Sequence, residues 1–145
     1  MIAEVTILIR LIIIAAISGL IGYERETRQR MIRGTAGLRT HMLVGLGATL
    51  LTLLTIYSFP IVYGTQADLG RMASYIVMGI GFLCAGTIIS GRGKLMGLTT
   101  AASIWLVAAI GIAIGLGSYF MAIITTAIAL IVLELWRLEK NVIDK

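Results

Sequence analysis

Long apolar stretches alternate with short polar segments along this chain. A helix needs roughly 20 mostly apolar residues to cross a bilayer core that is about 30 Å thick. Five stretches approach this length and predict membrane spans over residues 5–23, 40–59, 71–90, 99–115 and 119–136. Pro60 follows the second stretch, where a proline would end the helix. We therefore predict an all-α membrane protein with five transmembrane helices.

The basic residues gather in alternate connections between these spans. Ten of the twelve lie after spans one, three and five, and these are Arg25, Arg28, Arg30, Arg33, Arg39, Arg92, Lys94, Arg137, Lys140 and Lys145. Short cytoplasmic segments carry an excess of Lys and Arg. The pattern therefore predicts that the amino terminus lies outside the cell and the carboxyl terminus in the cytoplasm.

The composition excludes several classes of protein. Of the 145 residues, 59% are apolar and 13% are charged. A soluble domain has about 45–50% apolar residues and about a quarter charged residues. The chain is therefore neither a soluble nor a disordered protein, and it is too apolar for a nucleic-acid binder despite its net charge of +5. We expect residues 1–145 to form a single transmembrane domain with no soluble carboxyl-terminal domain.

The residues that could carry chemistry are few. The chain has one cysteine, Cys84, and one histidine, His41, which excludes an intrachain disulfide, a cysteine-based zinc site and a histidine-rich metal site. No pairing of nucleophile and base and no phosphate-binding loop stands out. We therefore expect no enzyme activity and no bound cofactor. Mg²⁺ remains open as a transported or sensed ion, with its ligands unknown.

Arg10 is the most costly residue in a predicted span. An arginine at the centre of the hydrocarbon is disfavoured by about 2.5–3.5 kcal/mol. Arg10 lies near the outer end of the first span, so its side chain can extend to the outer headgroups. The alternative is an ion pair with Asp68 or Glu4, which the predicted topology also places outside. A role in transport is a third, smaller alternative.

Polar residues also flank the connection between spans one and two. Glu24 and Arg25 end the first span, and Arg39 and His41 begin the second. These residues are either interfacial and paired at the surface, or they form one cluster that closes the inner mouth of the helix bundle. A single hairpin joins the two segments, so the cluster is a reasonable expectation.

Two glycine-containing segments each allow a structural and a functional interpretation. Residues 79–86 contain Gly81 and Ala85 at the spacing that lets helix backbones approach closely, which favours packing over a solute path. Residues 97–102 start the fourth span at the predicted cytoplasmic face. Helix capping and the excess of inner positive charge account for that segment, and contact with lipid phosphates or an acidic partner is the alternative.

Four strings of residues together resemble the MgtC/SapB family of small membrane proteins. They are GLIGYERE at 19–26, AGLRTHMLVGLGA at 36–48, GIGFLCAGTII at 79–89 and GLTTAASIWLVAAIG at 97–111. They occur in the family's order and spacing, and the resemblance covers about residues 5–136. The matching motif positions include Gly22, Glu24, Arg25, Arg39, Thr40, Gly79, Gly81, Gly86, Gly97, Thr99 and Thr100.

The resemblance implies a multi-pass protein of the inner membrane of a bacterium or archaeon, with five spans and the amino terminus outside. Family members are linked to growth at low magnesium and to virulence, through survival inside host cells. The best known member regulates the membrane ATP synthase. The chain departs from the family at Cys84, where glycine is usual, and at Met78, where a small or polar residue is common. Many members continue into a cytoplasmic domain after the fifth span.

Three functions remain to be weighed. The first is a regulator that contacts a membrane partner such as an ATP synthase. The second is a transporter or channel for Mg²⁺ or another small solute, working as an oligomer with a dimer as the default. The third is a structural or lipid-binding protein of the bilayer. Transport is disfavoured because every acidic residue lies at or beyond the predicted membrane edges, whereas Mg²⁺ prefers oxygen ligands such as carboxylates.

Overall fold

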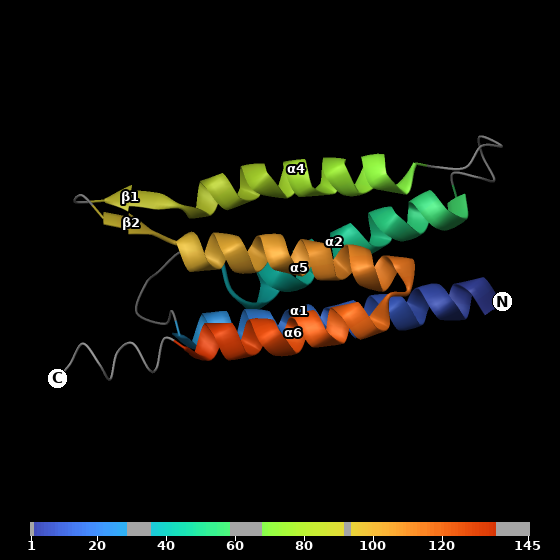
Figure 1. Ribbon diagram of the computed structural model, residues 1–145, viewed down its shortest axis with the longest axis horizontal. Coiled ribbons are helices and arrows are strands. Elements are labelled where there is room, and N and C mark those ends of the chain that lie inside the picture. Colours follow the sequence, from blue (N-terminus) through green and yellow to red (C-terminus); the bar gives the residue numbers. More distant parts are fainter. Residues whose placement is uncertain (1, 29–35, 59–67, 92–93, 136–145) are drawn as a thin grey trace.

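The computed structural model is a bundle of long helices that run side by side along its longest axis (Figure 1). It describes residues 2–28, 36–58, 68–91 and 94–135. The helices are α1 (Ile2–Arg28), α2 (Leu38–Leu53), α4 (Leu69–Thr87), α5 (Leu98–Leu116) and α6 (Tyr119–Glu134). A π-helical turn, η1 (Leu54–Ser58), continues α2. The predicted helical fold is thereby confirmed.

Four of these helices are long and apolar enough to cross a membrane, namely α1, α2 with η1, α4 and α5. The last, α6, is a shorter apolar helix of 16 residues. The predicted boundaries differ most at the carboxyl end of α1, which runs on to Arg28 rather than ending at residue 23.

A short hairpin between α4 and α5 was not predicted. Its strands β1 (Ile89–Gly91) and β2 (Lys94–Met96) are antiparallel, with Ser90 opposite Leu95. The third predicted span extended to residue 90, but α4 ends at Thr87. Gly97 follows the hairpin with a φ of +89°, and a β-carbon there would collide with the Thr87 carbonyl oxygen. Only glycine fits this return into α5 without strain.

The core lies between α1, α2 and α5. Ten residues of α5 are buried, including Ile104, Val107 and Ile114. Ile14 and Ile21 of α1 pack into the same cluster. In contrast, α4 buries only Ile76. The molecule therefore has a tightly packed centre and one helix, α4, that leaves most of its surface open.

Glycines let α2 and α5 approach each other closely. A β-carbon on Gly111 would lie 2.8 Å from the Gly45 carbonyl oxygen, and one on Gly115 would lie 2.6 Å from Thr52 Cβ. At the same contact, the Thr49 hydroxyl donates a hydrogen bond of 2.8 Å to the Gly111 carbonyl. Small residues and interhelical hydrogen bonds of this kind hold membrane helices together.

Candidate functional site

Three helix ends meet at one end of the bundle. The last turns of α1 and the first turns of α2 and α5 lie at the same end of the molecule (Figure 1). A β-carbon on Gly22 of α1 would lie 2.8 Å from Leu38 Cα, so this glycine admits the start of α2. The Glu26 carboxylate then accepts a hydrogen bond of 2.8 Å from the Leu38 amide. This contact satisfies one of the amides that a helix start leaves free.

His41 lies at the centre of this junction. Its side chain is fully buried. Its Nδ1 is 2.8 Å from the Gly37 carbonyl oxygen, and its Nε2 is 2.9 Å from Ser103 Oγ on α5. A carbonyl oxygen only accepts hydrogen bonds, so Nδ1 carries a proton. The imidazole therefore joins α2 to α5 through Nε2.

The Ser103 hydroxyl lies near two possible acceptors but can donate a hydrogen bond to only one of them. It lies 2.8 Å from the Thr100 carbonyl oxygen as well as close to His41 Nε2. A hydroxyl donates one hydrogen bond. With a neutral imidazole, Ser103 donates either to His41 or to Thr100. With an imidazolium, Nε2 donates to Ser103 and the hydroxyl is free to donate to Thr100.

Arg25 brings α1 into the same network. Its guanidinium is almost entirely buried, and Nη2 donates a hydrogen bond of 3.2 Å to Thr100 Oγ1. A buried charge is costly unless polar groups surround it, and Thr100 supplies one such group to Arg25. We call the four connected side chains the buried polar network. Its members are Arg25 of α1, His41 of α2, and Thr100 and Ser103 of α5.

The structure corrects part of the expected cluster of Glu24, Arg25, Arg39 and His41. Arg25 and His41 belong to the buried polar network. Arg39 does not, because it is exposed on the first turn of α2. Glu24 is half-buried, and its carbonyl accepts a hydrogen bond from Thr27 Oγ1. Ser103 was missed, because no sequence spacing shows that it faces His41 from another helix.

Arg10 lies toward the opposite end of the bundle and has partners other than the expected ones. Its Nη1 donates a hydrogen bond of 2.7 Å to the Gly115 carbonyl, and its Nε donates one of 3.2 Å to the Tyr119 hydroxyl. The positive charge thus lies at the carboxyl end of α5, where the helix dipole favours it. This arginine ties α1 to the turn between α5 and α6.

The ion pair of Arg10 with Asp68, one of the alternatives that the sequence left open, is not formed. Asp68 instead caps α4, where it accepts a hydrogen bond of 2.9 Å from the Arg71 amide. It also lies 3.4 Å from the Arg71 guanidinium. The amide hydrogen bond lowers the pKa of Asp68 below its ordinary value. Asp68 therefore acts as an exposed helix cap.

The glycines of α4 do not pack within the chain as the sequence suggested. A β-carbon on Gly79, Gly81 or Gly86 would meet no atom within 4 Å among the described residues. Cys84 of the same helix is half-buried, and its thiol donates to the Ala101 carbonyl across 3.2 Å. The Cys84 thiol therefore gives α4 a direct contact with α5 that these glycines do not.

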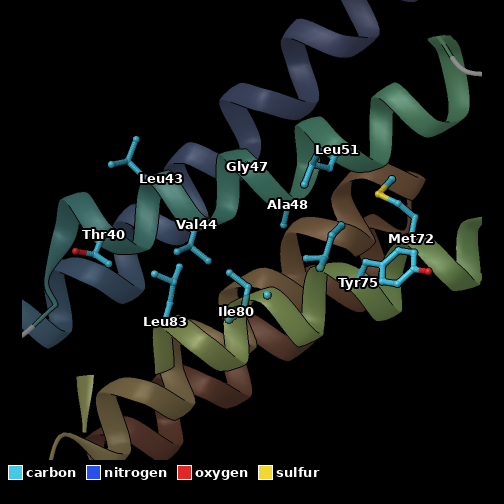
Figure 2. Close-up of a pocket in the computed structure, with 12 residues that line it drawn as sticks. Thr40, Leu43, Val44, Gly47, Ala48, Leu51, Met72, Tyr75, Ile80 and Leu83 are labelled. Atoms are coloured by element: carbon cyan, nitrogen blue, oxygen red, sulfur yellow. The ribbon is translucent and has the colours of Figure 1, made fainter. Parts of the chain in front are cut away.

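Two grooves on the described surface of the bundle are lined mainly by apolar side chains. One of about 700 Å³ lies between α2 and α4, with Thr40 and Leu83 near one end and Leu51 and Tyr75 toward the other (Figure 2). The other, of about 300 Å³, lies between α1, α5 and α6, and Thr99 and Ser103 are in its lining. Neither has the charged lining that a path for Mg²⁺ would need.

The part of the chain that the structure describes holds no group of three or more His, Cys, Asp or Glu side chains that could bind a metal ion. Its carboxylates are few, and Asp68 and Glu26 are both engaged with backbone amides. Mg²⁺ is commonly bound through one or two carboxylates with several retained waters. The described residues therefore offer no assembled magnesium site.

These features define a helical membrane protein with several apolar helices and a buried polar network at one end. The chain belongs to the MgtC family, whose sequence profile matches residues 11–141. This confirms the resemblance found in the sequence.

The family assignment is supported by individual relatives. The chain is 42% identical over 132 residues to a protein of Escherichia coli K12 named "Putative magnesium transporter YhiD", which covers 89% of this chain and 60% of that protein. It is 43% identical over 114 residues to "Protein MgtC" of Salmonella typhimurium LT2, covering 79% of this chain and 45% of that protein. With "Protein MgtC" of Brucella abortus, the identity is 39% over 121 residues, covering 83% and 47%.

The chain thus spans only about half of the length of these relatives. No solved structure matches it.

Proposed function

We propose that this chain is a non-enzymatic membrane regulator that acts in adaptation to low magnesium by contacting a partner in the membrane. The observation that carries the proposal is the apolar lining of both grooves, since a regulator needs no continuous polar path. The buried polar network supports it, because its groups bond to one another and hold three helix ends together.

The partner surface is proposed to be the outer face of α4. Phe82 and Met78 are among the most exposed large side chains that the structure describes, with Phe82 83% exposed. Because α4 buries only Ile76 within the chain, this face is available to another membrane protein. The family resemblance suggests the membrane ATP synthase as that partner, in the inner membrane of a bacterium.

The proposed topology has five spans, with the amino terminus outside and the carboxyl terminus in the cytoplasm. The charge pattern supports this orientation. On this basis the buried polar network lies near the cytoplasmic face and Arg10 near the outer face. We also propose assembly as a homo-oligomer, with a dimer as the simplest form.

The regulator proposal is tested by reconstituting the protein together with an F-type ATP synthase and measuring ATP-driven proton uptake. Uptake should fall when the protein is present. Phe82→Ala should weaken that effect, whereas Phe120→Ala should not, because Phe120 is similarly exposed but lies on α6. Unchanged proton uptake with an excess of folded protein would overturn this choice of partner.

Transport of magnesium or another small solute is the second candidate. It is favoured by the name of the Escherichia coli relative. The buried polar network across α1, α2 and α5 also supplies polar side chains that could line a solute path in an oligomer. Thr49 adds a further hydroxyl inside the bundle.

A further inference from the structure

The groove between α2 and α4 has features that the regulator proposal does not use. We propose that it binds the acyl part of one anionic phospholipid, whose headgroup phosphate is held by Arg39. The groove is lined by side chains from both helices, and Figure 2 shows Val44 of α2 pointing toward Ile80 and Leu83 of α4.

The length of the groove matches one leaflet of a bilayer. Its lining runs from Thr40 to Leu51 on α2 and from Met72 to Leu83 on α4. Each stretch covers eleven helical steps of about 1.5 Å, or about 16 Å in total. One leaflet contributes about half of a hydrocarbon core that is about 30 Å thick. An acyl chain of a single leaflet therefore spans the groove from end to end.

The lining of the groove suits a hydrocarbon chain. Ten of its twelve lining residues are apolar or glycine, and the other two are Thr40 and Tyr75. A flexible acyl chain can follow such a lining without burying an unpaired polar group of its own.

Two glycines create the free space. Gly47 and Gly79 both line the groove, and a β-carbon on either would meet no atom within 4 Å among the described residues. This differs from Gly111 and Gly115, whose β-carbons would collide with α2. Glycine inside a helix costs about 0.5–1 kcal/mol relative to alanine. Close contact within the chain does not account for Gly47 and Gly79, and both leave space in the groove that a larger side chain would fill.

The positive charge of Arg39 favours a lipid with an anionic headgroup. Arg39 directly precedes Thr40 at the end of the groove, and it lies four residues before Leu43, on the same face of α2. Its side chain is exposed and makes no hydrogen bond or ion pair with another described residue. A guanidinium binds phosphate oxygens in a two-pronged manner. Basic residues at the ends of membrane helices recognise anionic headgroups in this way.

Native mass spectrometry of the detergent-purified chain tests the proposal. The protein is mixed with phosphatidylglycerol or with phosphatidylcholine of identical acyl chains. We expect one retained phosphatidylglycerol per chain and weaker retention of phosphatidylcholine. Arg39→Gln should reduce the retention of phosphatidylglycerol by about fivefold, which is the effect of one Lys or Arg near an anionic surface. Arg71→Gln is the matched control: Arg71 precedes Met72 at the opposite end of the groove and is paired with Asp68, so the change should leave the retention unaltered.

The groove itself is tested by filling it. The double variant Gly47→Leu, Gly79→Leu should lose most of the retained lipid. The control is Gly81→Leu, because Gly81 has equally free surroundings but does not line the groove. Equal retention of the two lipids by the unchanged protein, or full retention by the filled variant, would overturn the proposal. A filled variant that changes oligomer mass but keeps its lipid would instead identify a second copy of this chain as the occupant.

A second measurement works on the unchanged protein if the filled variant does not fold. Phosphatidylglycerol with a photoreactive group on its acyl chain is reconstituted with the protein and activated by light. Labels should concentrate on residues 40–51 and 72–83. Labels spread evenly over the exposed faces of α1 and α6 would show that lipid contacts the chain without selecting this groove.

Discussion

At the residue scale, the buried polar groups of this bundle fall into two kinds. Some bond to the preceding turn of their own helix, as Ser18 and Thr126 do, and others join two helices. His41 and Ser103 join α2 to α5, Arg25 and Thr100 join α1 to α5, and Arg10 joins α1 to the turn after α5. Buried polar groups that lose a partner cost more than the bond itself is worth. Substitutions at these positions should therefore reveal which contacts hold the helix ends in place.

Ser103→Ala should destabilise the protein by about 1–3 kcal/mol, because His41 Nε2 would lose its hydrogen-bond partner in a buried site. Ser74→Ala is the matched control. Ser74 is exposed, and its hydroxyl bonds only to the Gly70 carbonyl one turn earlier. Thermal unfolding in detergent, followed by circular dichroism, measures both. Equal melting temperatures for the two variants would show that the His41–Ser103 contact contributes no stability.

Arg10→Leu should also lower stability, by about 1.5–3 kcal/mol for hydrogen bonds from a charged donor. Its loss leaves the Gly115 carbonyl without that donor at the carboxyl end of α5. Arg71→Leu removes only an exposed surface ion pair and should leave the melting temperature nearly unchanged. If Arg10→Leu unfolds at the same temperature as the original chain, then Arg10 only extends to the headgroups.

At the element scale, the helices divide into a packed centre and an open edge. The centre is formed by α1, α2 and α5, where glycines bring backbones together. The edge is α4, which contacts α5 through Cys84 and leaves a groove beside α2. The chain therefore has glycines at close helix contacts and glycines with free surroundings. Replacing a glycine by a larger residue should have different effects at the two kinds of position.

Gly111→Leu should prevent close contact of α2 with α5 and destabilise or unfold the protein, because even a β-carbon would lie 2.8 Å from the Gly45 carbonyl oxygen. Gly81→Leu should fold normally, since a β-carbon there meets no atom within 4 Å. Size-exclusion chromatography and melting temperatures in detergent compare the two variants. A stable Gly111→Leu protein would contradict the close packing of α2 on α5.

The sequence predicted the helices well and the contacts between them poorly. Apolar stretches of the right length placed each helix within a few residues, because hydropathy depends only on the local sequence. The hairpin of β1 and β2 was missed because each strand has only three residues, too few to show the alternation of apolar and polar positions that marks a strand. Ser103 and the partners of Arg10 were missed because they are set by how helices face each other, which one sequence does not show.

At the scale of the whole molecule, apolar helices surround a small polar interior, and the described surface grooves are apolar. This arrangement suits a protein that works through contact with lipids and membrane partners. It does not suit a carrier of a strongly hydrated ion, because Mg²⁺ gives up its waters reluctantly and needs oxygen ligands in exchange. Regulation and transport therefore make opposite predictions for ion flux.

The most direct test is magnesium flux into proteoliposomes loaded with a magnesium-sensitive dye. We predict that folded, monodisperse protein gives no more flux than empty vesicles, with and without a membrane potential. Ser103→Ala and Gly81→Leu proteins serve as comparisons, because a true path through the buried polar network would respond to the first and not to the second. Flux that saturates with Mg²⁺ concentration and falls in folded Ser103→Ala would contradict a purely regulatory role and establish transport.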